Sequence, residues 1–398
     1  MSEQMKKRQV PKLRFSEFRD EPEWQENELA QFLTESRVLG SKGNTAKKIT
    51  VKLWGKGVFG KNDEIQGSIN TQYYRRTAGQ FIYSKLDFLN QAFGIVPEYL
   101  DSYESTVDLP CFDMSQGINP IFLLEYVKRE DFYKRLGETA DGSRKARRIH
   151  ADTFLSFPIF MPRIEEQQKI ADCLSSINEL ISAQSQKVEA LKTHKKGLMQ
   201  QLFPREGETI PRLRFPEFQG EWEPQTVGSC AKVTTGNKDT QNKIEDGKYP
   251  FFVRSQNVER INSYYYDGEA ILTSGDGVGV GKNFHYINGK FDFHQRVYCI
   301  YGFKEGVSGR FLYHYFSEQF YSRVMQLNAK NSVDSVRMSM ITEMPIKVPF
   351  IKEQQKIADC LSSIDFLINV QSQKLEVLKT HKFSLVQQLY PAADEVEL

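Results

Sequence analysis

Apolar residues recur in steps of four and three along one stretch of the chain, and this stretch occurs twice. The copies cover Glu166 to Pro204 and Glu353 to Pro391, and 29 of their 39 aligned positions are identical at a constant offset of 187 residues. A 3.5-residue period keeps one apolar face of a helix against a partner helix, as in a coiled coil. The predicted seam comprises Ile170, Leu174, Ile177, Ile181, Val188, Leu191, Leu198, Ile357, Leu361, Ile364, Ile368, Leu375, Leu378 and Leu385.

Two polar positions interrupt each seam, Gln184 and Lys195 in the first copy and Gln371 and Lys382 in the second. Polar seam residues reduce stability but can fix the register of two helices. A dimerisation zipper between two chains is one interpretation. Two copies within one chain favour pairing of the copies with each other.

The connection between the two copies favours antiparallel helices. A helix of about 37 residues rises ~1.5 Å per residue and is roughly 55 Å long. Parallel helices would require the intervening stretch to return that distance, whereas antiparallel helices keep the connections short. We therefore predict an α+β fold, with two mixed α/β domains at opposite ends of an antiparallel two-helix coiled coil and pseudo-twofold symmetry.

The linkers are duplicated as well, because VPKLRFSEF (Val10 to Phe18) returns as IPRLRFPEF (Ile210 to Phe218). By pseudo-symmetry, the N-terminal arm should pack near Gln387–Tyr390, at the end of the second helix. The predicted segments are an arm (1–24), a first globular domain (25–162), a first helix (163–204), a linker (205–222), a second globular domain (223–348), a second helix (349–391) and an acidic tail (392–398).

The two globular stretches differ in sequence although their flanks match. In the first, we expect strands at Lys47 to Trp54 and Gln80 to Tyr83, and a helix around Leu123 to Leu136. Duplicated scaffolding around divergent inserts indicates one framework that presents two different binding surfaces.

Composition sets limits on the class of protein. The chain has 398 residues, of which 39% are hydrophobic and 26% charged, with a formal net charge of +2. No run approaches the ~18 apolar residues of a membrane span, and the N-terminus lacks the apolar core of a signal peptide. Five cysteines without a CxxC pair suggest a reducing cytosol and no zinc site. The near-neutral charge gives no argument for nucleic acid by itself.

Local basic clusters do suggest nucleic-acid contacts. Tyr73-Tyr74-Arg75-Arg76 places aromatic and cationic residues side by side, and Ser143–Arg148 holds four cations in six residues. Such residues suit phosphate contacts and bidentate recognition of guanine. A solvated surface loop is the alternative interpretation of each cluster.

A glycine-rich run, Ser274 to Asn283, resembles a nucleotide-binding loop only superficially. A Walker loop ending at Lys282 would need glycine where Asp276 stands and Ser or Thr where Asn283 stands. The dinucleotide spacing also fails, because its third glycine would fall on Val280 or Lys282. A glycine-rich turn that lets the backbone approach DNA fits better.

No complete catalytic motif is present. The sequence lacks HExxH and GxSxG, and Asn119-Pro120-Ile121-Phe122 departs at its third position from the Asn/Asp-Pro-Pro-aromatic motif of amino-methyltransferases. His194 and His381 occupy equivalent repeat positions beside the polar seam residue and are typical of a helix surface. We therefore expect no catalysis by this chain.

The chain combines two near-identical EQQKIA helices, at Glu166 and Glu353, with PxLRFxEF linkers at Pro11 and Pro211 and with two divergent inserts. This combination resembles the specificity subunit of type I restriction–modification systems. The resemblance spans essentially the whole chain. It implies that each globular domain is a target-recognition domain that reads one half of a bipartite double-stranded DNA site. It also implies that the coiled coil sets the spacer between half-sites, which lie about one helical turn (~34 Å) apart when they share a face of B-DNA.

The resemblance also implies partners. Modification subunits, two by the symmetry of the helices, would dock on the helical region and carry S-adenosylmethionine. ATP- and Mg-dependent restriction subunits would join the larger cytoplasmic complex. No cofactor or metal is expected on this chain itself.

The candidate DNA contacts are the cationic, aromatic and amide residues of the clusters above and of nearby loops. They are Lys47, Lys48, Tyr73, Arg75, Arg76, Arg144, Lys145, Arg147, Arg148, Ser274, Lys282, Asn283, Gln295, Arg296, Lys330, Asn331 and Arg337.

Three competing hypotheses remain open. A coiled-coil interaction scaffold without DNA specificity would show no salt-dependent binding to duplexes. An enzyme that binds a nucleotide at Gly275–Lys282 would be stabilised thermally by that nucleotide. A stand-alone repressor-like reader would bind specific DNA tightly without partners.

Overall fold

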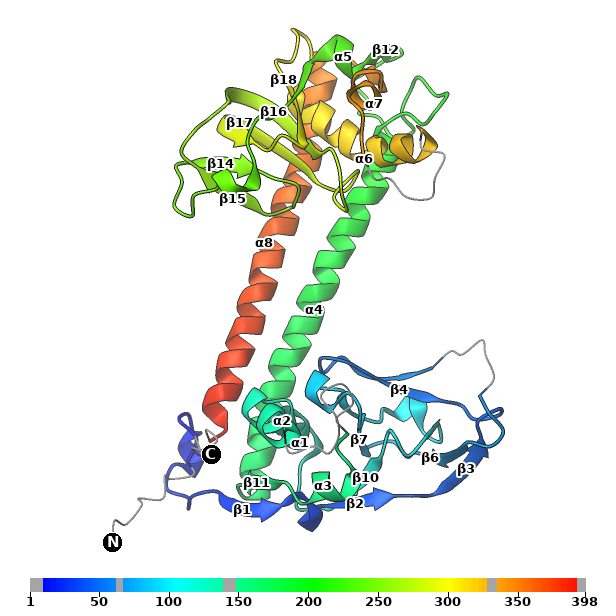
Figure 1. Ribbon diagram of the computed structural model, residues 1–398, viewed down its shortest axis with the longest axis vertical. Helices are drawn as coiled ribbons and strands as arrows, with labels where there is room; N and C mark the ends of the chain where they lie inside the picture. The colour runs from blue at the N-terminus through cyan, green and yellow to red at the C-terminus, as the bar shows by residue number, and fades with distance from the viewer. Residues whose placement is uncertain (1–9, 62–66, 139–147, 328–334, 392–398) are drawn as a thin grey trace. The chain divides into compact units, whose positions relative to one another are not determined.

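A computed structural model describes residues 10–61, 67–138, 148–327 and 335–391. The chain divides into two compact units, which we describe separately. Unit 1 contains residues 1–184 and 374–398, and unit 2 contains residues 185–373. Each unit therefore combines one globular domain with part of each long helix (Figure 1).

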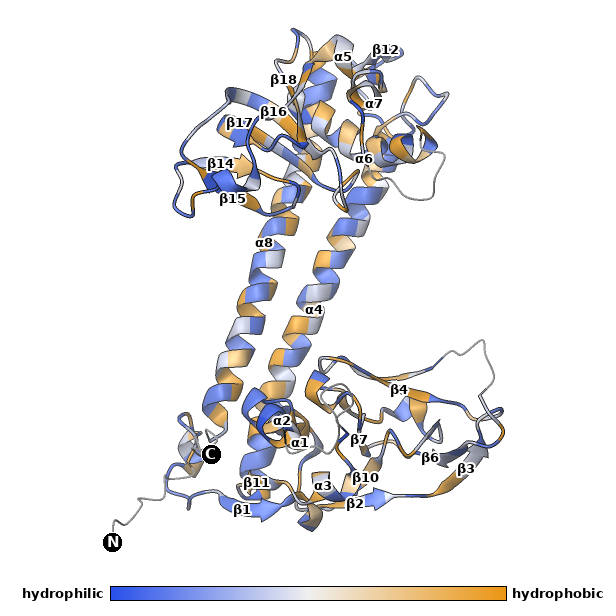
Figure 2. Ribbon diagram, in the orientation of Figure 1, coloured by the Kyte–Doolittle hydropathy of each residue, from blue (hydrophilic) through white to orange (hydrophobic). Residues whose placement is uncertain are grey.

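The duplicated stretches form two helices of 39 residues each, α4 (Ile164–Leu202) and α8 (Ile351–Leu389). Figure 2 shows short blocks of hydrophobic and hydrophilic positions alternating along both. In unit 1, Ile170 near the start of α4 shares a core with Leu389 at the end of α8. In unit 2, Leu202 at the end of α4 shares a core with Ile357 near the start of α8. The predicted antiparallel pairing is therefore confirmed within each unit.

Most of the apolar burial along these helices lies near the globular domains. Of the predicted seam residues, Ile170, Leu174, Ile177, Val188, Ile357 and Leu361 are buried. The others, Ile181, Leu191, Leu198, Ile364, Ile368, Leu375, Leu378 and Leu385, are partly exposed. Five of these six buried residues lie in the first four turns of α4 or α8 and belong to the domain cores, whereas Val188 is buried near the middle of α4. Domain packing therefore contributes much of the burial of the seam.

The domain of unit 1 is built on a four-stranded antiparallel sheet with the order β2-β10-β7-β8. Its strands are β2 (Leu33–Ser36), β7 (Phe81–Tyr83), β8 (Phe93–Ile95) and β10 (Cys111–Met114). A smaller sheet contains β3 (Leu39–Lys42), β6 (Gln72–Arg75) and β9 (Glu104–Ser105), and β4 (Ile49–Lys52) pairs with β5 (Gly57–Gly60). The helices are α1 (Pro120–Val127), α2 (Glu130–Gly137) and α3 (Ala151–Leu155), and β1 (Gln25–Glu28) pairs with β11 (Pro158–Met161).

The domain of unit 2 has a six-stranded sheet with the order β13-β18-β16-β17-β14-β15. Its strands are β13 (Lys232–Thr235), β14 (Tyr249–Phe252), β15 (Val258–Ile261), β16 (Tyr266–Ser274), β17 (Phe284–Phe293) and β18 (Val297–Tyr301). The helices are α5 (Val227–Cys230), α6 (Gly309–Leu327) and α7 (Met338–Thr342), and β12 (Glu223–Thr226) pairs with β19 (Pro345–Val348).

The two domains share a topology that their sequences do not reveal. In chain order, β2, β7, β8 and β10 correspond to β13, β16, β17 and β18, and both sets have the spatial order first, fourth, second, third. Unit 2 adds β14 and β15 at one edge, with β14 parallel to β17. The duplication therefore extends from the helices into the cores of the domains.

A buried ion pair joins each linker to the first turn of the helix in its own unit. The Arg14 guanidinium donates from Nε (2.9 Å) and Nη2 (2.7 Å) to the two carboxylate oxygens of Glu166. Arg214 makes the same bidentate contact with Glu353, at 2.8 Å for both bonds. Both carboxylates are almost fully buried. Bidentate pairing of this kind fixes orientation as well as adding energy.

The residue after each of these glutamates ties the domain to the helix. Gln167 Oε1 accepts from Asn119 N (2.9 Å), and its Nε2 donates to the carbonyls of Gly117 (3.1 Å) and Pro162 (3.0 Å). Gln354 has the same role in unit 2, where it bonds Ser308 N (2.8 Å) and the carbonyls of Gly306 and Pro349. These bonds place the start of α1, and likewise of α6, beside the start of a long helix.

An aromatic cluster completes the junction in each unit. In unit 1, the Phe122 ring lies 5.6 Å from Trp24 and 5.1 Å from Tyr390, which also contacts Tyr126 at 5.5 Å. In unit 2, the corresponding rings are Phe311, Trp222, Phe203 and Tyr315. Aromatic pairs at these distances add to the energy of burial.

The N-terminal arm packs against the end of the second helix, as predicted. Leu13 N donates to Gln388 O (2.9 Å) and the Trp24 ring lies 6.1 Å from Tyr390. The second linker repeats the contact in unit 2, where Leu213 N donates to Gln201 O (3.0 Å).

Two expected elements of the first domain are divided or shortened. The predicted helix around Leu123 to Leu136 is two helices, because Arg129 adopts an extended conformation between α1 and α2. The predicted strand Lys47 to Trp54 is limited to β4, because Trp54 has a φ of 60° and begins the turn into β5.

The polar seam lysines are neutralised in both units. Lys382 Nζ lies 2.8 Å from Glu125 Oε2 in unit 1, and Lys195 Nζ lies 2.6 Å from Asp365 Oδ1 in unit 2. Beside the second pair, His314 is 1% exposed. Burial and the neighbouring cations Lys195 and Arg310 lower the pKa of His314 to about 3, so its imidazole is neutral.

We predict that Glu166→Gln lowers the free energy of unfolding by about 3 kcal/mol, because it leaves the largely buried Arg14 guanidinium without a carboxylate. Chemical denaturation monitored by tryptophan fluorescence measures the change. Glu165→Gln is the matched control, since Glu165 is exposed in the same turn. Equal loss of stability in the two variants would show that the ion pair between Arg14 and Glu166 does not stabilise the fold.

We also predict that His314 makes folding sensitive to acid. The unfolded chain protonates this histidine below pH 6.5, whereas the folded protein keeps it neutral down to about pH 3. Stability is therefore lost as the pH falls through this window, by up to ~1.4 kcal/mol per pH unit for one proton. His314→Gln should flatten the dependence in pH-series unfolding, while His194→Gln, at an exposed position, should leave it unchanged.

Candidate nucleic-acid interface

The glycine-rich loop of unit 2, Ser274 to Asn283, connects β16 to β17. Its base is closed by the buried Asn283 side chain, whose Nδ2 donates to Ser274 Oγ (3.3 Å) and to Arg254 O (3.1 Å). Gly277 and Gly281 have φ values of 75° and 66°, which glycine adopts without strain. Val278 at the tip is 95% exposed, so the tip is free to contact a partner.

Two arginines flank this loop and share one carboxylate. Asp276 lies 2.9 Å from Arg254 Nη1 and 3.7 Å from Arg296 Nε. The arginine side chains are about half and two-thirds exposed, at 48% and 66%. Asp276 therefore holds both guanidinium groups at the loop while leaving donors available to solvent. Exposed arginines beside a glycine-rich turn suit contacts to phosphates or to guanine.

The backbone of Arg296 is held by a buried histidine. Arg296 N donates to His294 Nδ1 (2.9 Å). Burial lowers the pKa of His294, and the nearby cations Arg254 and Arg296 lower it further, against the opposing effect of Asp239 and Asp276. A neutral imidazole accepts this bond, so the histidine supports the position of Arg296.

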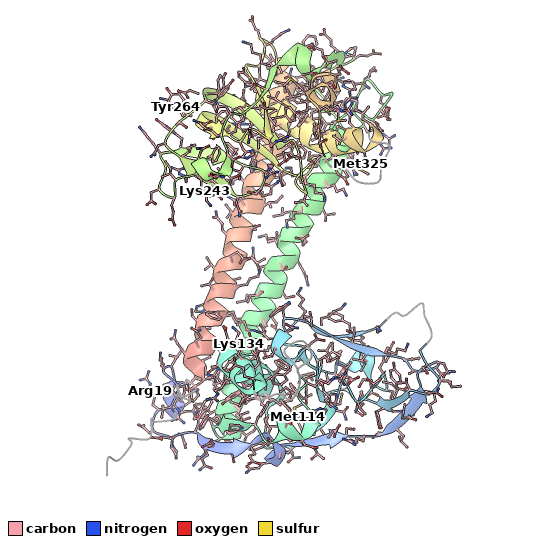
Figure 3. The ribbon with its side chains drawn as sticks, in the orientation of Figure 1. Arg19, Met114, Lys134, Lys243, Tyr264 and Met325 are labelled. Atoms are coloured by element: carbon pink, nitrogen blue, oxygen red, sulfur yellow. The ribbon has the colours of Figure 1, made fainter. Side chains whose placement is uncertain are left out.

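Aromatic and cationic side chains gather near β14 and β15. The Tyr249 and Tyr264 rings lie 5.3 Å apart, and Lys290 Nζ lies 4.7 Å from the centre of the Tyr264 ring. Figure 3 shows Lys243 and Tyr264 on the outer side of this domain. Exposed rings with cations are suited to stacking on bases and to contacts with phosphates.

In unit 1, exposed arginines lie at the small sheet β3-β6-β9, which has no counterpart among the described strands of unit 2. The buried Glu104 carboxylate accepts from Ser41 N (3.1 Å and 3.0 Å) and from Ser41 Oγ (3.0 Å), which fixes β3 against β9. Val38 and Leu39 are exposed at 55% and 70%, beside the exposed Arg37 and Arg75. Apolar side chains exposed next to arginines indicate a contact surface.

Three of the predicted contacts are corrected by the structure. Arg76 is 2% exposed and donates to Ser105 Oγ (2.8 Å) and to the carbonyls of Ser36 (2.7 Å) and Leu109 (3.4 Å). Its guanidinium therefore holds the domain together. Ser274 and Asn283 are buried at the base of the glycine-rich loop and shape that loop.

The other candidates are distributed over both domains. Lys47, Arg75, Lys282, Gln295, Arg296 and Arg337 are exposed, and Lys48 and Tyr73 are partly exposed. Arg148 is exposed and lies 3.2 Å from Asp108. Arg144, Lys145, Arg147, Lys330 and Asn331 lie outside the described residues. The structure brings Lys282 and Arg296 to the same loop region.

Sequence reasoning missed Arg254 and the role of Asp276. Asp276 was visible in the sequence, but only as a departure from a nucleotide-binding motif. Arg254 lies 22 residues earlier in the chain, and only the folded sheet brings it to the loop. The signal in the sequence was an acidic residue, Asp276, within a glycine-rich loop that has basic residues near it.

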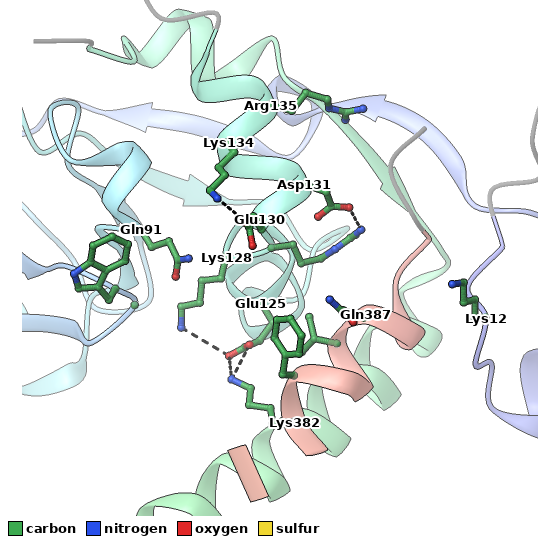
Figure 4. A pocket seen from close by; sticks show the side chains of 15 residues that line it. Lys12, Gln91, Glu125, Lys128, Glu130, Asp131, Lys134, Arg135, Lys382 and Gln387 are labelled. Carbon is green, nitrogen blue, oxygen red and sulfur yellow. Dashed lines mark hydrogen bonds and ion pairs between the residues drawn. The ribbon is translucent and has the colours of Figure 1, made fainter. Parts of the chain in front are cut away.

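A cavity of about 950 Å³ lies in unit 1 between α1, α2 and the end of α8 (Figure 4). Its lining is mainly charged and includes Lys128, Arg129 and Lys382. Within residues 10–61, 67–138, 148–327 and 335–391, no group of three or more His, Cys, Asp or Glu side chains could hold a metal ion. In the part of the chain that the structure describes, no helix is long and apolar enough to span a membrane.

Comparison with known proteins bears on this arrangement. Residues 219–380 match the family model described as type I restriction modification DNA specificity domain. The chain is 29% identical over 154 residues to the type I restriction enzyme EcoDI specificity subunit of Escherichia coli. It is 24% identical over 259 residues to the MjaVIII specificity subunit of Methanocaldococcus jannaschii. These alignments cover 39% and 58% of this chain, and only 33% and 60% of the relatives.

The fold gives wider coverage. The crystal structure of a type I restriction–modification S subunit from M. genitalium superposes with a TM-score of 0.65 at 13% identity, over 97% of this chain and 100% of that one. The resemblance to type I specificity subunits is confirmed. A second structure, from work on complex assembly and conformational transition of the type I R-M system, has a TM-score of 0.53 at 13% identity, over 93% of this chain and 98% of that one. The specificity-subunit fold thus extends well beyond the segment that the family model matches.

We predict that substitutions of two neighbouring arginines differ in their effect on stability. Arg76→Met should lower the free energy of unfolding by about 2 kcal/mol or more, because it removes the bonds that the buried guanidinium donates to Ser36 O, Leu109 O and Ser105 Oγ. Arg75→Met, at an exposed position, should change it by less than about 0.5 kcal/mol. Thermal and chemical unfolding of both variants measures this. Equal stability would show that Arg76 has no structural role.

Proposed function

We propose that this chain is the DNA-specificity subunit of a type I restriction–modification complex and that the domain of each unit reads one half of a bipartite site. The observation that carries this proposal is the repetition of one junction beneath two different surfaces. The ion pair, the glutamine and the four aromatic rings recur in both units. The surface loops on the shared four-strand topology do not recur.

The chemistry of the two surfaces supports DNA as the ligand. Arg254 and Arg296 flank a loop whose tip is exposed, and Arg37 and Arg75 lie beside exposed apolar residues in the other domain. Arginine is the side chain best suited to bidentate contacts with guanine, and phosphate contacts supply most of the non-specific affinity. Different side-chain sets on a common frame would give two unrelated half-sites.

We further propose roles for the paired helices and for the partner subunits. The paired helices set the spacer between half-sites and present a docking surface to modification subunits, two by the internal symmetry of the chain. Those subunits supply S-adenosylmethionine, and restriction subunits supply the ATP- and Mg-dependent steps. This chain is proposed to catalyse none of these reactions and to act in the cytoplasm.

We predict that Arg296→Ala weakens binding of the assembled modification complex to its target duplex by about tenfold or more, because a contact to a base or phosphate is lost. Competition titrations with substituted duplexes locate the effect, which should fall on one half-site only. Lys304→Ala is the matched control, since Lys304 is exposed elsewhere in the same domain.

The same titrations distinguish a DNA reader from a coiled-coil scaffold. A reader loses affinity steeply as salt rises, because counterions are released from the phosphates on binding. A complex with verified modification subunits that shows no salt-dependent preference for any duplex would overturn the proposed function.

A further inference from the structure

Each polar seam lysine meets a carboxylate, but the carboxylate comes from a different element in each unit. In unit 1, Lys382 on α8 lies 3.0 Å and 2.8 Å from the two oxygens of Glu125, which belongs to α1 of the globular domain. In unit 2, Lys195 on α4 lies 2.6 Å and 2.7 Å from the two oxygens of Asp365, which belongs to the other long helix. The lysines occupy the same position of the duplicated sequence.

The duplication identifies the residues that correspond at these two sites. The glutamine contacts align Asn119 with Ser308, and the aromatic clusters align Phe122 with Phe311. The same alignment pairs Glu125 with His314. On the helices, the offset of 187 pairs Asn178 with Asp365. In unit 1 the carboxylate is Glu125, on the domain, and the helix carries the neutral Asn178. In unit 2 the carboxylate is Asp365, on the helix, and the domain carries the neutral His314.

In unit 1, the Glu125 carboxylate is buried in the wall of the cavity described above, and its charge is balanced from several sides. Glu125 is 4% exposed, and its carboxylate also faces Lys128 Nζ at 3.7 Å and Asn178 Nδ2 at 3.5 Å. Figure 4 shows Lys128 and Lys382 converging on it. Burial raises the pKa of Glu125, but the charges of Lys128 and Lys382 and the hydrogen bonds from Lys382 and Asn178 outweigh this, so its pKa lies below the usual value.

The site of unit 2 uses the neutral histidine where unit 1 has the carboxylate. His314 Nε2 lies 3.2 Å from Ser362 Oγ, and its Nδ1 lies 4.0 Å from Asp365 Oδ2. Because the domain position is a neutral histidine, the carboxylate that contacts Lys195 directly is Asp365 of the helix. Burial raises the pKa of the nearby Glu318, and the charges of Lys196 and Lys195 offset only part of this rise.

We propose that this exchange of a carboxylate between domain and helix assigns each domain to its own half of the helix pair. A domain with histidine at the position of Glu125, placed on the half that carries Asn178, would leave Lys382 without the carboxylate it contacts here. A domain with glutamate at the position of His314 would place two carboxylates around Lys195. If the domain of unit 1 stood there, its Lys128 would come with that glutamate and offset part of the negative charge. The first misplacement is therefore the more costly.

The consequence for specificity rests on the proposed function. If each domain reads one half-site, these positions restrict which pairs of recognition domains one chain can combine. The pairing of residues itself does not depend on DNA, and its test does not involve DNA. Failure of the pairing and failure of the proposed function are therefore distinguishable.

The test is a double-substitution cycle in the full-length chain, read by hydrogen exchange of the amides of α1. Glu125→His should lower their protection about tenfold, and adding Asn178→Asp should restore it to within about twofold, since residues that share a charge network are coupled. The amides of α6 serve as the internal reference. Glu189→Gln, which removes an exposed pair with Lys192, should leave α1 unchanged.

A reciprocal cycle keeps the test decisive if Glu125→His does not fold. Asp365→Asn should lower the protection of α6, and adding His314→Glu should restore it. The assignment is wrong if Asn178→Asp changes protection equally with and without Glu125→His, or if His314→Glu gives no recovery in the Asp365→Asn background.

Discussion

The bidentate pair between a linker arginine and the first-turn glutamate of a long helix is the contact on which each unit depends. Arg14 and Glu166, and likewise Arg214 and Glu353, join a linker and a helix at the point where a domain begins to pack. A buried carboxylate without a partner would be costly, so linker and helix must meet in one geometry. The neighbouring glutamine then fixes the domain, and the aromatic cluster excludes water. This repeated junction explains why the linkers and helices are nearly identical while the domains differ.

The seam lysines show how a repeated scaffold can still distinguish its two ends. A charged residue in a helix seam adds little stability, but it requires a counter-charge nearby. The chain satisfies that requirement with Glu125 in one unit and Asp365 in the other. Near-identical helices can therefore accept different domains without making the domains interchangeable.

The periodic helices, their antiparallel pairing and the docking of the N-terminal arm could be predicted, because each depends on repeated or local patterns. The shared four-strand topology could not be predicted. Strands of two to four residues in the first domain are too short to show a clear alternation of apolar and polar residues, and they differ in length from β16 and β17 of the second domain. Arg75 and Arg76 look alike in sequence, but consecutive residues of an extended segment face opposite ways and only Arg76 turns inward. The pairing of Asp276 with Arg254 depends on contacts between separate strands, which no local pattern reveals.

The central claim is that one framework carries two independent readers of DNA, and a map of methylated sites tests it most directly. The chain is co-expressed with a cognate modification subunit, and the DNA is sequenced by a method that detects methyladenine. The measurement is repeated after residues 232–301, which hold the sheet of the second domain, are replaced by the corresponding stretch of another specificity subunit. We expect a bipartite motif in which one half changes while the other half and the spacer are retained. A change in both halves, or in the spacer, would contradict the account.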